Sequence, residues 1–222
     1  MRHEVATRRV LYEIPGMQSV QVRESEFKGA NGDPLPLEIY DAINPISDAI
    51  VAIVAGLPDA GFEKHVGCKF MEMEWTICIA RLIAASGMTA ITHSNPDPVP
   101  DAEALMAHLA TMTSNIGIWA TSGHGPVALK AAAKAKCAVF TNPITTDFWP
   151  QVPLFVVRSG NDRTPRLNDG LDRFVVHAIA ENHPITLVNY PEAPHSFELE
   201  LDGHETRRIL QQGLDFLRAH LV

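Results

Sequence analysis

The sequence predicts an α/β fold, built on a mostly parallel, twisted sheet with helices on both faces. Short apolar runs rich in β-branched residues recur along the chain, and runs of this length suit strands that are buried on both faces of a parallel sheet. Apolar residues at helical spacing lie between these runs. Ahead of them, two alternating segments flank a turn rich in Gly, Asn and Pro, which indicates an antiparallel hairpin at the sheet edge.

The expected elements follow one another in a regular order. The hairpin is expected to pair residues 20–23 with residues 35–39, around the turn at 28–34. Four strands are expected at 49–55, 88–92, 116–121 and 154–158, with two more at 137–141 and 185–189. One helix face combines Leu167, Leu171, Phe174, Val175, Ala178 and Ile179, and a second combines Leu210, Leu214, Leu217 and Leu221. Ligands of such sheets bind beyond the carboxyl ends of the strands.

Size and composition favour one globular domain over residues 1–222. Hydrophobic residues make up 46% of the chain and charged residues 20%, which is the balance of a protein with a substantial core. The net charge of −8 argues against a nucleic-acid partner or an anionic membrane, because both need clustered cations. The sequence predicts no oligomeric state.

Cysteine usage and the longest apolar stretches indicate a cytoplasmic location. Cys68, Cys78 and Cys137 are odd in number and lack CxxC spacing, so we expect free thiols and no zinc site. The N-terminal segment lacks the long apolar stretch of a secretory signal. The best candidate for a membrane span, residues 75–85, is too short and contains Arg81.

The segment 116–129 carries the clearest chemical signal. Its apolar strand stops at a Thr-Ser-Gly and leads at once into an Ala-rich helix, which predicts a strand-to-helix elbow with Ser122 as the nucleophile. Such an elbow needs small residues two positions on either side. Ala120 meets this need and His124 does not, whereas Thr121 is a poorer nucleophile because Trp119 would then occupy the crowded position. The alternative is that Ser122 only caps the helix.

A serine nucleophile needs a base, and the base needs an acid. His195 lies in the loop after the last expected strand, and Asp162 lies in the turn after strand 154–158. The chain order Ser, Asp, His is the order of α/β-hydrolases. Asp162 has the alternative role of a turn-former, and Asp169 or Asp172 then remain as candidates for the acid.

A glycine-punctuated loop at 55–62 follows the first parallel strand. Such a loop can turn a backbone N–H towards a developing oxyanion. Because Pro58 has no N–H, Leu57 is the expected donor there, with Gly123 as the second. A plain connecting loop is the alternative.

Four motifs occur in a fixed order: Gly-Leu-Pro-Asp at 56–59, Trp-Ala-Thr-Ser-Gly-His-Gly at 119–125, Gly-Asn-Asp at 160–162 and Ala-Pro-His-Ser-Phe at 193–197. Together they resemble the dienelactone-hydrolase-related branch of the α/β-hydrolases, from about residue 49 to the C-terminus. The resemblance implies a triad of Ser122, His195 and Asp162, without metal or organic cofactor. Dienelactone hydrolases proper use a cysteine nucleophile, so Ser122 departs from that pattern, and His124 is a second departure.

The resemblance also frames the expected activity. Many relatives insert a cap domain between the strands expected at 137–141 and 154–158, but this connection is short, so we expect an open site without a cap domain. The predicted function is a serine hydrolase that cleaves a small carboxylic ester or lactone through an acyl-enzyme. One alternative, motivated by His124, is a non-catalytic protein of the same fold that binds a small ligand. The other is an acyltransferase with the same triad.

Overall fold

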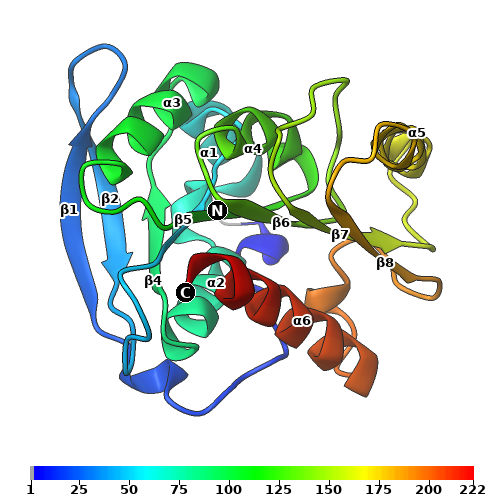
Figure 1. Cartoon of the computed structure of the whole chain (residues 1–222). Coiled ribbons are helices and arrows are strands. Elements are labelled where there is room, and N and C mark those ends of the chain that lie inside the picture. The colour runs from blue at the N-terminus through cyan, green and yellow to red at the C-terminus, as the bar shows by residue number, and fades with distance from the viewer. Residues whose placement is uncertain (1–2) are drawn as a thin grey trace.

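A computed structural model describes residues 3–222, and its strands form one eight-stranded sheet in the order β1-β2-β4-β3-β5-β6-β7-β8 (Figure 1). β1 and β2 form an antiparallel hairpin, β2 pairs antiparallel with β4, and the remaining neighbours are parallel. The strands are β1 Val22–Lys28, β2 Pro34–Tyr40, β3 Ile50–Ile53, β4 Thr89–His93, β5 Ile116–Thr121, β6 Cys137–Thr141, β7 Leu154–Ser159 and β8 Ile185–Tyr190.

Helices cover both faces of this sheet, as Figure 1 shows. α2 and α6 pack on one face, and α3, α4 and α5 pack on the other. The α-helices are α1 Asp59–Val66, α2 Glu74–Ala85, α3 Pro98–Leu109, α4 Gly125–Ala132, α5 Leu167–Ala180 and α6 His204–Leu221. Short 3₁₀ turns occur at Glu4–Thr7, Met17–Ser19, Phe70–Glu72, Ser122–His124 and Phe197–Leu199.

The central strands are apolar throughout because each of their faces meets a helix layer. In β3, Val51 and Ile53 pack in the cluster that contains α2 and α6. Their neighbours Ile50 and Ala52 pack in the cluster that contains α3, α4 and α5. Successive side chains of a strand point to opposite faces, so burial on both sides demands a continuous apolar run.

The structure confirms the predicted fold class and every predicted strand. The ends of β5 and β6 are as predicted, and the ends of the other strands are shifted. The hairpin strand predicted at 20–23 is observed as Val22–Lys28, and the strand predicted at 49–55 ends already at Ile53. The predicted helix faces also pack on the sheet, with one error. Ile179 was expected on the buried face of α5 but is 65% exposed. It lies roughly 100° around the helix from the centre of the apolar stripe, at the margin where the sheet no longer covers it.

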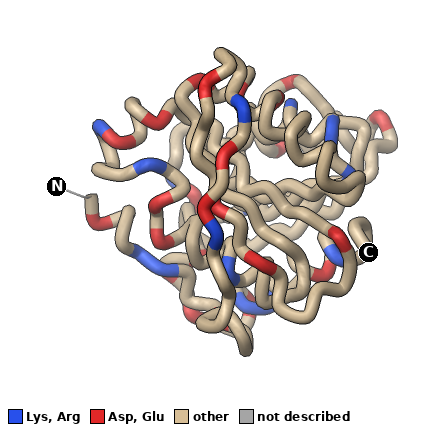
Figure 2. Tube along the Cα trace, turned by 90° about the vertical axis from the view of Figure 1, so that its left-hand side faces the viewer, with Lys and Arg blue, Asp and Glu red and all other residues tan. Residues whose placement is uncertain are grey.

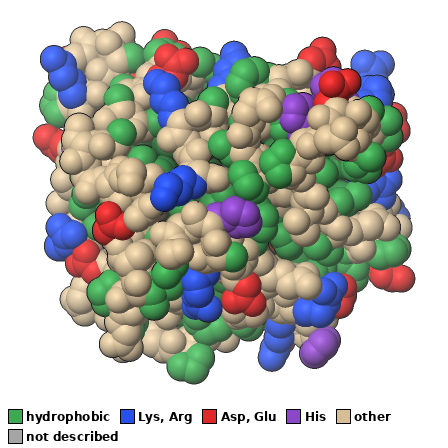
Figure 3. All heavy atoms as spheres, viewed as in Figure 1, with side chains coloured by type: hydrophobic (Ala, Val, Ile, Leu, Met, Phe, Trp, Pro, Cys, Tyr) green, Lys and Arg blue, Asp and Glu red, His purple; other side chains and the backbone are tan. Residues whose placement is uncertain are grey.

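The connection between β6 and β7, residues 142–153, contains neither a helix nor a strand. No cap domain is therefore inserted between these two strands. Lys and Arg are dispersed among acidic residues on the views of Figures 2 and 3.

Within residues 3–222, no helix is both long enough and apolar enough to cross a membrane.

Candidate active site

Ser122 lies on a sharp turn between β5 and α4. The strand ends at Thr121, Ser122 has φ = 48°, and a 3₁₀ turn over Ser122–His124 leads directly into the helix. A positive φ is uncommon for a residue with a side chain and costs about 1–3 kcal/mol, so surrounding contacts must hold it. One such contact is the hydrogen bond from Ile144 N to Ser122 O, at 2.9 Å. The turn is a strained elbow that presents the serine hydroxyl beyond the strand.

The elbow needs close packing of backbone on backbone, and glycines provide it. A Cβ on Gly125 would lie 3.1 Å from the Pro143 side chain and closer still to the Ile144 carbonyl. His124 occupies the position where a small residue was expected. The facing loop packs on the backbone of His124, since a Cβ on Gly56 would lie 2.6 Å from His124 Cα. The His124 ring stacks on Phe70, with centroids 3.8 Å apart.

His195 and Asp162 lie beside Ser122 in a hydrogen-bonded row. Ser122 Oγ is 2.9 Å from His195 Nε2, and His195 Nδ1 is 2.6 Å from Asp162 Oδ2. The Asp162 side chain is fully buried, whereas the His195 ring is 30% exposed. Asp162 Oδ1 accepts a further hydrogen bond from Thr164 N at 2.8 Å, which orients the carboxylate. The structure thus brings the three residues predicted from sequence to bonding distance.

Backbone hydrogen bonds tie the loop of Asp162 to the loop of His195. Gly160 N donates to Tyr190 O at 2.8 Å, and Asn161 N donates to Ala193 O at 2.9 Å. Gly160 is required at this crossing because a Cβ would lie 2.7 Å from Pro191 Cα. The distance between the acid and the imidazole is therefore set by backbone contacts.

The alternative acids are placed elsewhere. Asp172 lies on α5 and forms an ion pair with Arg158 at 2.6 Å, and Asp169 lies in the first turn of the same helix. Neither has a contact with His195 in the described part of the chain. Across residues 3–222, no three His, Cys, Asp or Glu side chains converge as a group able to hold a metal ion.

The predicted oxyanion donors, Leu57 and Gly123, face each other across the elbow. A Cβ on Gly123 would be in van der Waals contact with Leu57 Cδ1, at 3.7 Å. Gly123 lies in the first turn of the 3₁₀ helix, where amides lack an acceptor within the helix. Leu57 N has no acceptor among residues 3–222. The Gly123 amide directly follows Ser122, and the Leu57 side chain lies beside it.

Two histidines behind this loop were not assigned a role from sequence. His93 Nε2 accepts a hydrogen bond from Ala55 N at 3.1 Å, and His124 Nδ1 accepts one from Gly56 N at 2.8 Å. Burial lowers the pKa of His93, and it lowers the pKa of His124 to about 3. Both rings are therefore neutral near pH 7. Sequence gives no signal for these bonds, because neither ring neighbours the loop along the chain.

Glu198 is a buried carboxyl group below the site. It lies three residues after His195, and its Oε1 accepts a hydrogen bond from Trp75 Nε1 at 2.8 Å. Burial raises its pKa, while the Trp75 hydrogen bond and the nearby His195 act in the opposite direction. No local pattern in the sequence marks this residue as part of a site.

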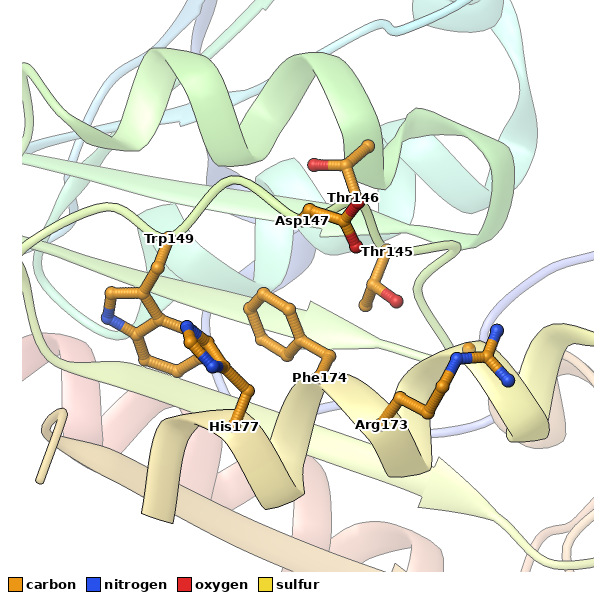
Figure 4. A pocket seen from close by; sticks show the side chains of 8 residues that line it. Thr145, Thr146, Asp147, Trp149, Arg173, Phe174 and His177 are labelled. Carbon is orange, nitrogen blue, oxygen red and sulfur yellow. The ribbon is translucent and has the colours of Figure 1, made fainter. Parts of the chain in front are cut away.

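A groove of about 410 Å³ lies between residues 145–149 and α5. Figure 4 shows Trp149 and His177 at one end, Phe174 in the middle and the Arg173 guanidinium at the other end, with Asp147 across from the helix. The Trp149 and Phe174 rings stack with centroids 4.5 Å apart. This groove is not lined by Ser122, His195 or Asp162. Its wall nevertheless begins next to Ile144, whose amide binds Ser122 O.

Comparison with known proteins bears on the fold. No protein-family model and no curated protein sequence matches this chain. Among solved structures, the chain is similar to EstE1, a thermophilic and thermostable carboxylesterase cloned from a metagenomic library, with 14% identity, coverage of 91% of this chain and 90% of that one, and a TM-score of 0.72. It is similar to the esterase LipW from Mycobacterium marinum, with 12% identity, 97% and 93% coverage, and a TM-score of 0.70.

A peptidase shares the same architecture. Dipeptidyl peptidase 4 from Porphyromonas gingivalis is 14% identical over 91% of this chain, which covers 36% of that protein, with a TM-score of 0.69. Together with the strand order and the elbow, these similarities show that the chain has the α/β-hydrolase fold. The fold alone hosts several reactions, so the reaction must be argued from the site.

Proposed function

We propose that this protein is a serine-dependent hydrolase of small carboxylic esters or lactones. The observation that carries the proposal is the hydrogen-bonded row from Ser122 Oγ through the His195 ring to the buried Asp162 carboxylate. The positive φ of Ser122 adds support, since strain at a side-chain-bearing residue is concentrated at functional sites. Membership of the dienelactone-hydrolase-related branch is part of this proposal.

The reaction follows from the positions of these groups. His195 Nε2 takes the proton of Ser122 as Oγ attacks the ester carbonyl, and the Leu57 and Gly123 amides stabilise the oxyanion. Asp162 holds the proton on Nδ1 and stabilises the imidazolium. His195 then protonates the departing alcohol. A water molecule, activated by the same ring, hydrolyses the acyl-enzyme and restores the serine.

The position of His124 favours a catalytic protein over one that only binds a ligand. The elbow has no small residue at position 124, and this departure motivated the alternative of a non-catalytic protein that binds a small ligand. The His124 ring, however, accepts a hydrogen bond from Gly56 N and stacks on Phe70 with centroids 3.8 Å apart, while Ser122 Oγ stays 2.9 Å from His195 Nε2. A cap-free connection between β6 and β7 suits small, accessible substrates.

Turnover of a short-chain aryl ester tests the proposal. Wild type should hydrolyse the ester, and Ser122→Ala should lose activity by a factor on the order of 10³ or more. Ser114→Ala, at an exposed serine ahead of β5, is the matched control and should keep full activity. Persistent turnover in Ser122→Ala would refute the serine mechanism. Formation of new esters with an added alcohol, in place of free acid, would identify an acyltransferase.

A further inference from the structure

Two buried histidines hold consecutive amides of the loop that carries Leu57. His93, at the end of β4, accepts from Ala55 N, and His124, after the elbow, accepts from Gly56 N. The two rings come from different strand ends and reach the loop from separate segments. The next amide along the chain is that of Leu57.

The Leu57 amide differs from the neighbouring amides of the loop in its hydrogen bonding. Val54 N and Asp59 N donate to backbone carbonyls at 3.1 and 3.0 Å, and Pro58 has no N–H. With Ala55 N and Gly56 N bound to the imidazoles, Leu57 N is the one amide between 54 and 59 that lacks an acceptor in the described chain. Leu57 is 41% exposed and its side chain lies against Gly123, so its amide is open to a substrate oxygen.

Each imidazole can accept only in one tautomer. His93 Nδ1 lies 3.0 Å from Ser94 O, so Nδ1 carries the proton and Nε2 is the acceptor. For His124 the acceptor is Nδ1, which places the proton on Nε2. Burial keeps both rings neutral, as their lowered pKa values indicate. Protonation of either acceptor nitrogen would set one N–H against another and break the bond.

The loop needs these two hydrogen bonds because it contains Gly56. The position excludes any side chain, because a Cβ would lie 2.6 Å from His124 Cα. Glycine leaves the backbone free to rotate, and rotation at Gly56 would change the direction of the Leu57 amide. Bonds at Ala55 N and Gly56 N fix the two peptide units that precede this amide.

We propose that His93 and His124 are positioning residues, which orient the 54–59 loop so that Leu57 N donates to the oxyanion. The inference rests on the proposed hydrolase function and adds to it two residues outside the Ser122, Asp162 and His195 row. By orienting a donor to the oxyanion, the two histidines stabilise the transition state. Their removal should therefore lower kcat and leave KM nearly unchanged.

A substitution series at His124 tests the role of its acceptor nitrogen. In His124→Asn, Oδ1 lies as many bonds from the backbone as Nδ1 and can accept from Gly56 N. In His124→Leu the acceptor is absent, but contact with Phe70 is retained. We expect kcat for an aryl ester to fall on the order of 10²-fold in His124→Leu and only a few-fold in His124→Asn, because an oxyanion donor displaced by about 1 Å loses that much. His65→Asn, at an exposed histidine on α1, should match wild type.

Imidazole ¹⁵N spectra of the wild type give a readout that needs neither turnover nor a variant. The inference requires neutral rings at pH 7, with the proton on Nδ1 of His93 and on Nε2 of His124. Other tautomers would overturn it, as would equal kcat in His124→Leu and wild type. A wild type without ester turnover and without fluorophosphonate labelling would overturn the proposed function, and this inference with it. An active wild type with an unaffected His124→Leu overturns this inference alone.

Discussion

Acid should destabilise the fold through His124, and the structure sets the size of the effect. The ring is buried and its pKa lies at about 3, against 6.5 for an ordinary histidine. The unfolded chain therefore binds one more proton than the native state between these values, so stability is full above pH 6.5 and is lost as the pH falls towards 3. At pH 4.5 the loss is about 2.7 kcal/mol, from two pH units at about 1.4 kcal/mol each. His124→Asn should lack this contribution.

Urea unfolding of wild type and His124→Asn at pH 7.0 and pH 4.5, followed by circular dichroism, measures the effect. The quantity of interest is the loss of unfolding free energy between the two pH values, compared between the proteins. Carboxyl groups elsewhere titrate in both proteins, so the comparison cancels them. The loss should be smaller in His124→Asn by about 2–3 kcal/mol. Losses that agree within about 0.5 kcal/mol would refute a neutral, buried His124.

Three further predictions concern the neighbouring residues. Asp162→Asn should lower kcat on the order of 10⁴-fold with an intact fold, because the amide favours the wrong imidazole tautomer, and steady-state ester turnover measures this. Gly160→Ala should lower the unfolding free energy by about 1–3 kcal/mol, since its Cβ would overlap Pro191, while Gly61→Ala, where a Cβ meets nothing within 4 Å, should stabilise α1 by about 0.5–1 kcal/mol. Burial raises the pKa of Glu198, so the contribution of this residue to stability should fall as the pH rises from 4.5 through that raised pKa, and the Tm of wild type relative to that of Glu198→Gln should fall over the same range.

Much of the sheet follows from local pattern. The strands from β3 to β7 are read from continuous apolar runs, which suit a strand between two helix layers. β8 was predicted from the same kind of run, but it lies at the sheet edge and none of its residues is fully buried. Strand ends were less predictable because they depend on partners from other segments. Residues 54 and 55 have the composition of a strand, but the Ala55 amide binds the His93 ring in place of a neighbouring strand.

The candidate site was predictable wherever its residues lie in recognisable local contexts. Ser122 is signalled by a strand that turns abruptly into a helix, and Asp162 and His195 by turns after later strands. The structure places the three at hydrogen-bonding distance. Their catalytic roles remain predictions.

The hydrogen bonds from the Leu57 loop to His93 and His124 could not be predicted from the sequence. In the sequence, His124 is a departure from the small residue that the elbow needs, but in the structure its ring accepts a hydrogen bond from Gly56 N, 68 positions away. The His93 contact likewise joins residues 38 positions apart. Contacts between such distant segments become visible only when the backbone brings them together.

The most direct test of the serine mechanism is peptide mass spectrometry after labelling with a fluorophosphonate, which reacts only with an activated serine. The hydrogen-bonded row of Ser122, His195 and Asp162 predicts a single adduct, on the peptide that contains Ser122, and none in the Ser122→Ala variant. A folded wild-type protein without an adduct, or an adduct that persists in Ser122→Ala, would contradict the mechanism.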